Sequence, residues 1–164
     1  MFYKWDRVMK MFFLESDKGF TVREISKKTK VPSSSVQRYL KELKKEGLVD
    51  ENNKARITPY FKFLKTYFII NKIYTCGLYD YLINELNPSL IILYGSVRKG
   101  EYDNESDIDL FVESSVKKDI KLISYEKKFG LSIHLMIEQD VHKLNQNLFN
   151  NLITGIKIFG IIKY

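Results

Sequence analysis

The feature that most constrains this 164-residue chain is a pair of short polar motifs, each set against an apolar run. Gly95 and Ser96 close the apolar run 90–94, and after ten further residues Asp107 and Asp109 open a second apolar run. Apolar runs of this length predict buried strands. Residues two apart on a strand share a face, so both carboxylates are expected to point to one place.

The glycine-serine turn has the properties of a phosphate site. Gly95 lets the backbone turn sharply and approach a ligand closely. A short helix over 96–100 would direct its free N–H groups and its positive dipole end at an anion. The Ser96 hydroxyl adds a donor, and Arg98 or Lys99 adds positive charge. We therefore predict that these four residues bind a nucleotide through its phosphates.

The carboxylate pair has the properties of a divalent cation site. Mg²⁺ prefers oxygen ligands and is commonly held by one or two carboxylates together with substrate phosphate and water. Asp107 and Asp109 supply such ligands for Mg²⁺ or Mn²⁺. Transfer at phosphorus needs mainly positioning and neutralisation of charge. The two motifs together predict a site that handles a nucleoside triphosphate (NTP) with a metal ion.

The pattern Gly-Ser, ten residues, Asp-x-Asp resembles the signature of the DNA polymerase β-like nucleotidyltransferase superfamily. Within it, the chain is similar to the minimal nucleotidyltransferases related to kanamycin nucleotidyltransferase, over about residues 88–164. The resemblance implies an α/β domain with a sheet of mixed direction. It also implies transfer of a nucleoside monophosphate from NTP to a hydroxyl, with pyrophosphate as product and with Asp107 and Asp109 as catalytic metal ligands.

One position departs from that family. The family carries a third carboxylate on a later strand, and the matching strand 131–137 has His134 there. A histidine can act as a general base near neutral pH, but it is a poorer Mg²⁺ ligand than a carboxylate. Glu138 lies about 13 Å further along the strand, at ~3.3 Å per residue, and is a weak substitute. His134 is therefore either a catalytic base or a strand residue without a chemical role.

Charge divides the chain into two parts. Residues 1–88 hold 17 Lys and Arg against 10 Asp and Glu, whereas residues 89–164 hold 10 of each. The excess of positive charge predicts a polyanionic partner for the first part only. We expect three segments: a first domain over 1–60, a linking or dimerisation helix over 61–87 and the nucleotidyltransferase domain from residue 88 to the end.

The first part has the signals of two helices joined by a turn. Thr21 and Glu24 form the Thr-x-x-Glu pattern of a capping box, which predicts a helix start. Residues 29–32 indicate a turn, and a second helix is predicted over 33–46, where Gly47 follows as a stop. An apolar face at helical spacing, with Val36, Leu40 and Leu43, predicts that the second helix packs on a core.

Residues 48–58 indicate a strand, a polar turn and a strand. Two helices and this hairpin resemble the winged helix-turn-helix DNA-binding domain, over about residues 5–60. The resemblance implies that the second helix enters the major groove of duplex DNA and that the hairpin wing contacts the backbone; a protein-contact role for the same fold stays open. The residues predicted to contact DNA are Ser34, Ser35, Gln37, Arg38, Lys41 and Lys44 on the helix and Lys54 and Arg56 on the wing.

The linking segment 61–87 is apolar and aromatic, which indicates a core or homodimer surface. Charged residues interrupt it before it reaches the ~18–20 residues of a membrane span. Gly77 either divides it into two helices or is tolerated within one. The single cysteine, Cys76, excludes an internal disulfide and is expected to be buried. The charged start of the chain, residues 1–6, does not resemble a signal peptide, so we expect a cytoplasmic protein.

The predicted fold class is α+β: an N-terminal winged helix-turn-helix, a linking helix and a C-terminal α/β nucleotidyltransferase domain. In the last domain we also predict helices over 114–128 and 140–152 and a final strand or irregular tail over 156–164.

Two functions from different classes stay open. The first is a Mg²⁺-dependent nucleotidyltransferase that modifies a hydroxyl on a protein, an RNA or a small molecule and carries a DNA-binding module. Minimal nucleotidyltransferases of this size resemble the antitoxin half of toxin–antitoxin pairs, which implies a HEPN-domain toxin as partner. The second is a DNA-binding transcriptional regulator whose nucleotidyltransferase fold has lost its chemistry and only senses nucleotide. The intact motifs favour the first, and His134 favours the second.

Overall fold

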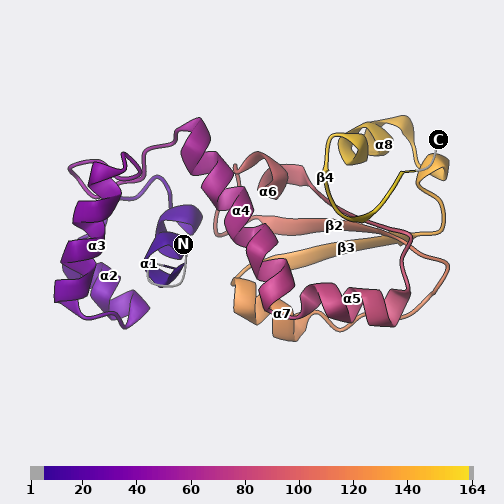
Figure 1. Ribbon diagram of the computed structural model, residues 1–164, viewed down its shortest axis with the longest axis horizontal. Helices are drawn as coiled ribbons and strands as arrows, with labels where there is room; N and C mark the ends of the chain where they lie inside the picture. Colours follow the sequence, from indigo (N-terminus) through magenta and orange to yellow (C-terminus); the bar gives the residue numbers. More distant parts are fainter. Residues whose placement is uncertain (1–5, 163–164) are drawn as a thin grey trace. The chain divides into compact units, whose positions relative to one another are not determined.

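The computed structural model describes residues 6–162, and these form two compact units (Figure 1). Residues up to Lys62 belong to the first unit and residues from Phe63 onward to the second. Two short stretches lie outside the described residues. They are residues 1–5, which belong to the charged start of the chain, and the last two residues of the predicted tail.

The described part of the first unit includes α1 (Asp6–Leu14), α2 (Val22–Thr29) and α3 (Ser33–Lys45). The predicted capping box starts α2. The Glu24 N–H donates to the Thr21 hydroxyl at 3.2 Å, and the Thr21 N–H donates to the Glu24 carboxylate at 2.8 Å. Two N–H groups that would otherwise lack a helical partner are thereby satisfied.

The second predicted helix, α3, packs as its sequence indicates. Val36, Leu40 and Leu43 are buried, and the chain leaves the helix through Gly47, whose φ of 72° is in the left-handed region. The predicted wing is a tight hairpin rather than a pair of long strands. The Asp50 N–H donates to the Lys54 carbonyl at 2.8 Å, and an isolated bridge joins Val49 to Ala55.

Two helices occupy the segment predicted as a link. They are α4 (Pro59–Thr75) and α5 (Leu78–Leu86), and Gly77 divides them with a φ of 85°. From Phe63 onward this segment belongs to the second unit. Cys76, expected to be buried, is half-buried. Within residues 6–162 the structure has no helix with the length and apolar character needed to cross a membrane.

The second unit is built on a four-stranded sheet of β1 (Leu90–Tyr94), β2 (Asp107–Glu113), β3 (Ser132–Glu138) and β4 (Ile156–Gly160). The strand order is β3-β2-β1-β4. β1 runs antiparallel to β2 and β4, whereas β2 runs parallel to β3. The predicted mixed sheet is therefore confirmed, and the first two strands are the apolar runs next to the two motifs.

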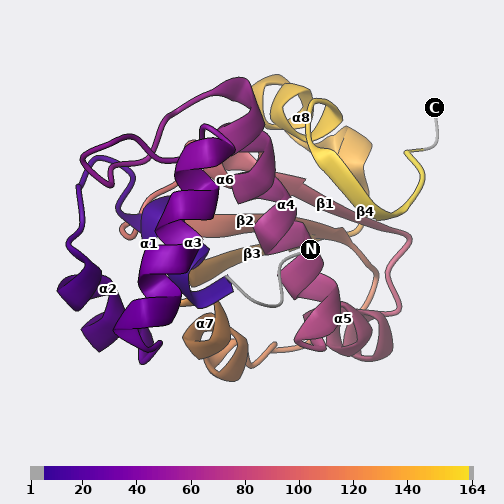
Figure 2. The same ribbon diagram turned by 60° about the vertical axis from the view of Figure 1, so that its left-hand side comes forward.

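One face of the sheet carries both a core cluster and the motif carboxylates. Alternate residues of β1 (Leu90, Ile92 and Tyr94) pack with Val141 and Leu152, which come from the 3₁₀ turn η1 (Val141–Lys143) and from α8 (Gln146–Ile153). Helices α5 and α7 (Ile123–Phe129) lie on the side away from α8 (Figures 1 and 2). Because antiparallel partners share a face, Asp109, which pairs with Tyr94, lies on the α8 side.

The helix predicted over 114–128 is wrong in its first half, since only α7 (Ile123–Phe129) forms. The Ser114 N–H continues the sheet by donating to the Glu138 carbonyl at 2.8 Å. The Ser114 hydroxyl then accepts the Val116 N–H at 3.0 Å. A hydroxyl that takes a backbone N–H two residues on favours a turn over a helix.

The single helix predicted over 140–152 is also wrong. η1 and α8 replace it, because two polar side chains cap two separate turns. The Asp140 carboxylate accepts the His142 N–H at 2.9 Å, and the Asn145 side chain accepts the Leu148 N–H at 2.9 Å. A side-chain cap favours a helix start at its own position.

Candidate nucleotide site and DNA-binding surface

The glycine of the first motif lies directly against a carboxylate of the second. Gly95 begins the short helix α6 (Gly95–Lys99) with a φ of 71°. A Cβ atom at Gly95 would stand 2.0 Å from Oδ2 of Asp109. Only glycine fits this position, both for its backbone angle and for the space next to the carboxylate. The predicted turn therefore lies directly beside the predicted carboxylate pair.

Strand register brings the remaining residues to the same place. Asp109 pairs with Tyr94 on one side and with His134 on the other, and Asp107 pairs with Ser132. The His134 ring contacts Asp109 directly, with 3.2 Å between Nδ1 and Oδ1. Asp107 and Asp109 are two apart on β2 and share its face. The three residues predicted as catalytic are thus neighbours on adjacent strands.

The site is exposed to solvent at His134 and is closed on its buried side by Tyr94. The side chain of His134 is 57% exposed and that of Asp109 is 25% exposed. Tyr94 is buried, and burial together with the nearby charge of Asp109 raises the pKa of its hydroxyl. Tyr94 therefore stays neutral beneath the site and adds no negative charge to that of the aspartates.

The donor set fits Mg²⁺ or Mn²⁺. Asp107 and Asp109 offer carboxylate oxygens, and Gly95 keeps the space beside Oδ2 of Asp109 free of side-chain atoms. Across residues 6–162, no group of three or more His, Cys, Asp or Glu side chains is arranged to enclose a metal ion. Mg²⁺ commonly takes one or two carboxylates from a protein and its other ligands from phosphate and water.

The other predicted phosphate residues lie along α6. Ser96 is half-buried in its first turn, and Lys99 is exposed at its end. The Arg98 guanidinium donates to the Thr154 hydroxyl at 3.3 Å, at the end of α8. Arg98 therefore contacts the end of α8. The two residues are 56 positions apart, and the sequence pattern does not indicate this contact.

Three residues outside the sequence motifs join α4 to the segment between the motifs. Lys65 and Thr66 lie on α4, and Tyr102 lies in the connection from α6 to β2. The position of Lys65 in the sequence could have indicated its burial. It lies four residues from both Phe61 and Ile69, which are buried, so a lysine occupies the core face of a helix.

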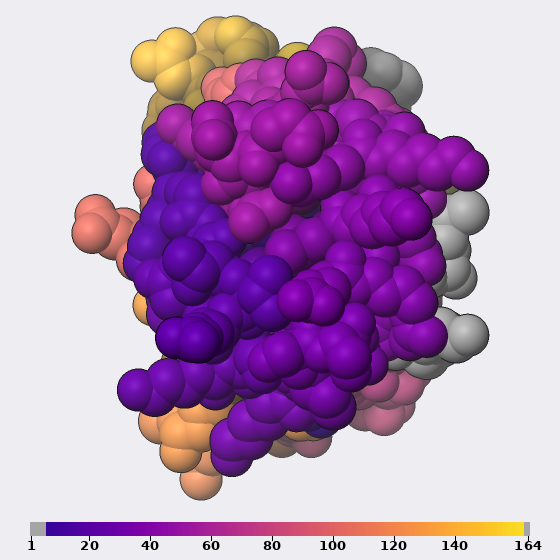
Figure 3. Space-filling model, turned by 90° about the vertical axis from the view of Figure 1, so that its left-hand side faces the viewer, coloured from indigo at the N-terminus to yellow at the C-terminus, as the bar shows by residue number. Residues whose placement is uncertain are grey.

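Three of the eight residues predicted to contact DNA line a groove between α3 and the wing, on the unit whose surface Figure 3 shows. The groove has a volume of about 550 Å³, and Gln37, Lys41 and Lys44 of α3 line it. Lys44 also donates to the Glu51 carbonyl at 3.0 Å, which ties the helix to the wing. Ser34, Arg38 and Arg56 are exposed outside the groove, and Ser35 and Lys54 are half-buried.

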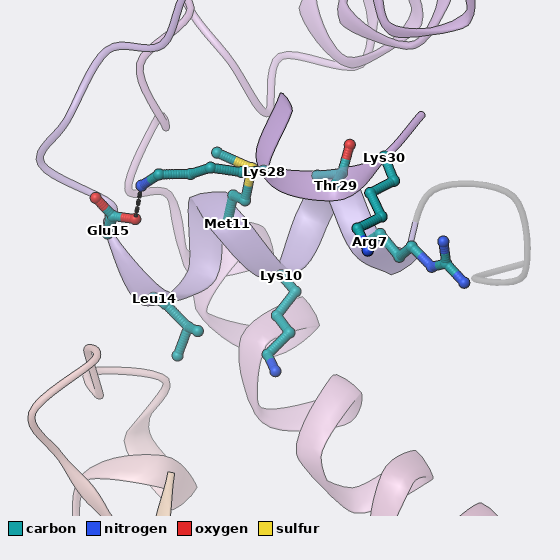
Figure 4. Close-up of a pocket in the computed structure, with 8 residues that line it drawn as sticks. All are labelled: Arg7, Lys10, Met11, Leu14, Glu15, Lys28, Thr29 and Lys30. Carbon is teal, nitrogen blue, oxygen red and sulfur yellow. Dashed lines mark hydrogen bonds and ion pairs between the residues drawn. The ribbon is translucent and has the colours of Figure 1, made fainter. Parts of the chain in front are cut away.

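A second cationic hollow, of about 510 Å³, lies between α1 and the end of α2 (Figure 4). Arg7, Lys10, Lys28 and Lys30 line it, and Lys28 pairs with Glu15 at 2.8 Å. Its basic side chains contribute to the excess of positive charge in the first unit.

Two family models match separate parts of the chain. Residues 80–158 match the family model of the nucleotidyltransferase domain, and residues 13–74 match that of the sugar-specific transcriptional regulator TrmB. A relative from Methanocaldococcus jannaschii, named "Putative protein adenylyltransferase", is 25% identical over 75 residues, which cover 43% of this chain and 74% of the relative. The chain therefore contains a nucleotidyltransferase domain preceded by a TrmB-type winged helix DNA-binding domain.

Proposed function

We propose that this protein transfers AMP from ATP to a hydroxyl group of a protein, with Mg²⁺ bound by Asp107 and Asp109, and that its first unit binds duplex DNA. The observation that carries the proposal is the contact between the two motifs. Gly95 leaves space for one carboxylate, and strand pairing places His134 against that same carboxylate. The relative named as an adenylyltransferase supports ATP as the donor.

The transfer is a substitution at the α-phosphorus. The acceptor oxygen forms a bond to this phosphorus, the bond to the oxygen that bridges to the β-phosphorus breaks, and pyrophosphate leaves. When bound, the metal ion shields the charge of the triphosphate. Asp107 and Asp109 would hold it, while the Gly95 turn and Ser96 would bind phosphate oxygens.

His134 would receive the proton of the attacking hydroxyl. An ionised carboxylate only accepts hydrogen bonds, so in the contact with Asp109 the ring hydrogen would lie on Nδ1. Nε2 is then left with a lone pair on a side chain that is more than half exposed. Asp109 would thus orient the base, which supplies the function that the family assigns to a third carboxylate.

The open site favours a macromolecular acceptor. His134 and Asp107 are exposed, so a hydroxyl on the surface of another protein can approach them. The resemblance to minimal nucleotidyltransferases makes a tyrosine of a HEPN-domain toxin the first acceptor to test.

Two observations favour a second candidate, a regulator that binds nucleotide without transferring it. His134 stands where the family has an acid. The Arg98 guanidinium, which was predicted to bind phosphate, donates to the Thr154 hydroxyl instead.

A labelling experiment separates the two. The full chain is incubated with cell lysate and with ATP that carries ³²P in either the α or the γ position, with and without Mg²⁺. AMP transfer labels an acceptor from α-labelled ATP only, and only with Mg²⁺. If the wild type labels nothing while His134→Asp labels an acceptor, the nucleotide-sensing regulator is the better account.

A further inference from the structure

Two buried polar residues of α4 hold the segment that joins the motifs. This connector, residues 97–106, runs from α6 to the start of β2. Lys65 and Thr66 are only 3% and 7% exposed. Burial of a polar or charged side chain is costly unless it is hydrogen-bonded. Both side chains donate hydrogen bonds to backbone carbonyls of the connector.

Thr66 binds the beginning of the connector. Its hydroxyl is 2.8 Å from the Val97 carbonyl and 3.3 Å from the Arg98 carbonyl. These carbonyls belong to the last turn of α6, where the Val97 carbonyl also accepts the Gly100 N–H at 3.1 Å. Thr66 therefore fixes the end of the helix that starts at Gly95.

Lys65 binds the middle of the connector in both directions. Its ammonium donates to the Tyr102 carbonyl and lies 4.6 Å from the centroid of the Tyr102 ring. The Tyr102 hydroxyl donates back to the Lys65 carbonyl at 3.1 Å. Burial raises the pKa of this hydroxyl well above its usual value, so it remains a donor at neutral pH.

The connector sets the distance between the two motifs. Beyond Tyr102, the Ser106 hydroxyl donates to the Asp103 carboxylate at 2.9 Å, and Asp107 follows at once. The position of Asp107 relative to Gly95 therefore depends on how the residues between them are held. A displacement of about 1 Å at a site that depends on positioning has a large effect on its function.

We propose that Lys65 and Thr66 are positioning residues of the nucleotide site, which fix the connector so that Asp107 and the Gly95 turn bind one Mg²⁺–ATP. This inference rests on the proposed function. It assigns a role to two residues that lie outside both motifs and contact the segment between them.

The test compares three full-length threonine variants. Thr66→Val removes the hydroxyl at nearly constant volume, and Thr66→Ser keeps it. Thr75→Val is the control on the same helix, because the exposed Thr75 hydroxyl bonds a carbonyl of α4 itself, that of Asn71 at 2.9 Å, rather than one of the connector. Calorimetry measures the Kd of Mg²⁺–ATP, and hydrogen exchange measures protection of residues 97–106 in the free protein.

We expect Thr66→Val to raise the Kd about tenfold, the factor that corresponds to about 1.4 kcal/mol, and to speed exchange in the connector. Thr66→Ser and Thr75→Val should resemble the wild type in both measurements. Lys65→Met should act in the same direction as Thr66→Val.

If Thr66→Val lowers the melting temperature but leaves Kd and connector exchange at wild-type values, Thr66 is only structural and the inference is wrong. If the wild type and Thr75→Val do not bind Mg²⁺–ATP at all, the proposed function fails and the positioning role fails with it. The exchange measurement still reports whether α4 holds the connector.

Discussion

The two units place their functional residues in different ways. In the first unit, most residues predicted to contact DNA lie on the single helix α3, and in the second the candidate site draws on three strands and a turn. Charge differs as well. Residues 1–62 hold 15 Lys and Arg against 8 Asp and Glu, whereas residues 63–164 hold 12 of each.

This difference shows which parts of a function tolerate change. A surface on one helix loses affinity by increments when single contacts are removed. A site made by strand register depends on every partner, because a slip of one residue turns a side chain to the opposite face. Substitutions at the Gly95 turn and at the aspartates of β2 should therefore have large effects on nucleotide binding, and those on α3 should have graded effects on DNA binding.

The largest effect is expected at Gly95. Gly95→Ala places a Cβ against the Asp109 carboxylate and should abolish Mg²⁺–ATP binding while DNA binding persists. Gly77→Ala is the matched control, since Gly77 also has a positive φ but has open space around its Cβ position. Both variants should lose about 1–2 kcal/mol of stability from backbone strain. Normal ATP binding by Gly95→Ala in calorimetry would contradict the proposed geometry.

The next effect concerns the base. His134→Ala should lower the rate of AMP transfer by about 10²–10⁴-fold, the range for a positioned acid–base group, and should leave ATP binding largely intact. His134→Asp restores the family's third carboxylate and should keep the activity or raise it. Rates from single-turnover labelling provide the measurement, and an unchanged rate in His134→Ala removes His134 from the mechanism.

Graded effects are expected in the first unit. Arg38→Ala or Lys41→Ala should weaken duplex DNA binding by about 1–3 kcal/mol if the side chain contacts a base. Affinity should also fall steeply with salt, because phosphate contacts release counterions. Lys143→Ala, at an exposed lysine of the second unit, is the control and should have no effect. If the protein gives no gel shift even at low salt, the winged helix serves protein contacts.

The smallest effect concerns pH. Hydrogen bonds from the Thr21 N–H and hydroxyl hold the pKa of the Glu24 carboxyl below its usual value. The stability that this contact contributes is therefore present above the unfolded-state pKa and is lost as pH falls through the lower folded-state pKa. Thr21→Ala should move the Glu24 pKa upward in an NMR titration.

Asp103 in the second unit is the internal reference for that titration. Its pKa is held low by the Ser106 hydroxyl and the Glu105 N–H, neither of which Thr21→Ala changes. If the Asp103 pKa moved together with that of Glu24, the change would not be local to the capping box.

Local signals in the sequence predicted local structure. The capping box at Thr21 and the spacing of Val36, Leu40 and Leu43 depend on residues a few positions apart, and both are confirmed. The helix predicted over 114–128 failed because Ser114 bonds across the sheet to Glu138, a partner that composition does not reveal.

The same limit applies to the candidate site. The motif spacing indicated the Gly95 turn and the two aspartates, and the resemblance to a family pointed to His134. The Lys65–Tyr102 and Arg98–Thr154 contacts join residues 37 and 56 positions apart, so they follow only from the packed structure.

The central claim is that Asp107 and Asp109 hold a divalent cation for nucleotide binding, and one calorimetric titration tests it. The double variant Asp107→Asn with Asp109→Asn is titrated with ATP in the presence and absence of Mg²⁺, beside the wild type. We expect Mg²⁺-dependent binding in the wild type and none in the variant, whose melting temperature should be unchanged or higher because two like charges are removed. Undiminished Mg²⁺-dependent binding by the variant would contradict the account.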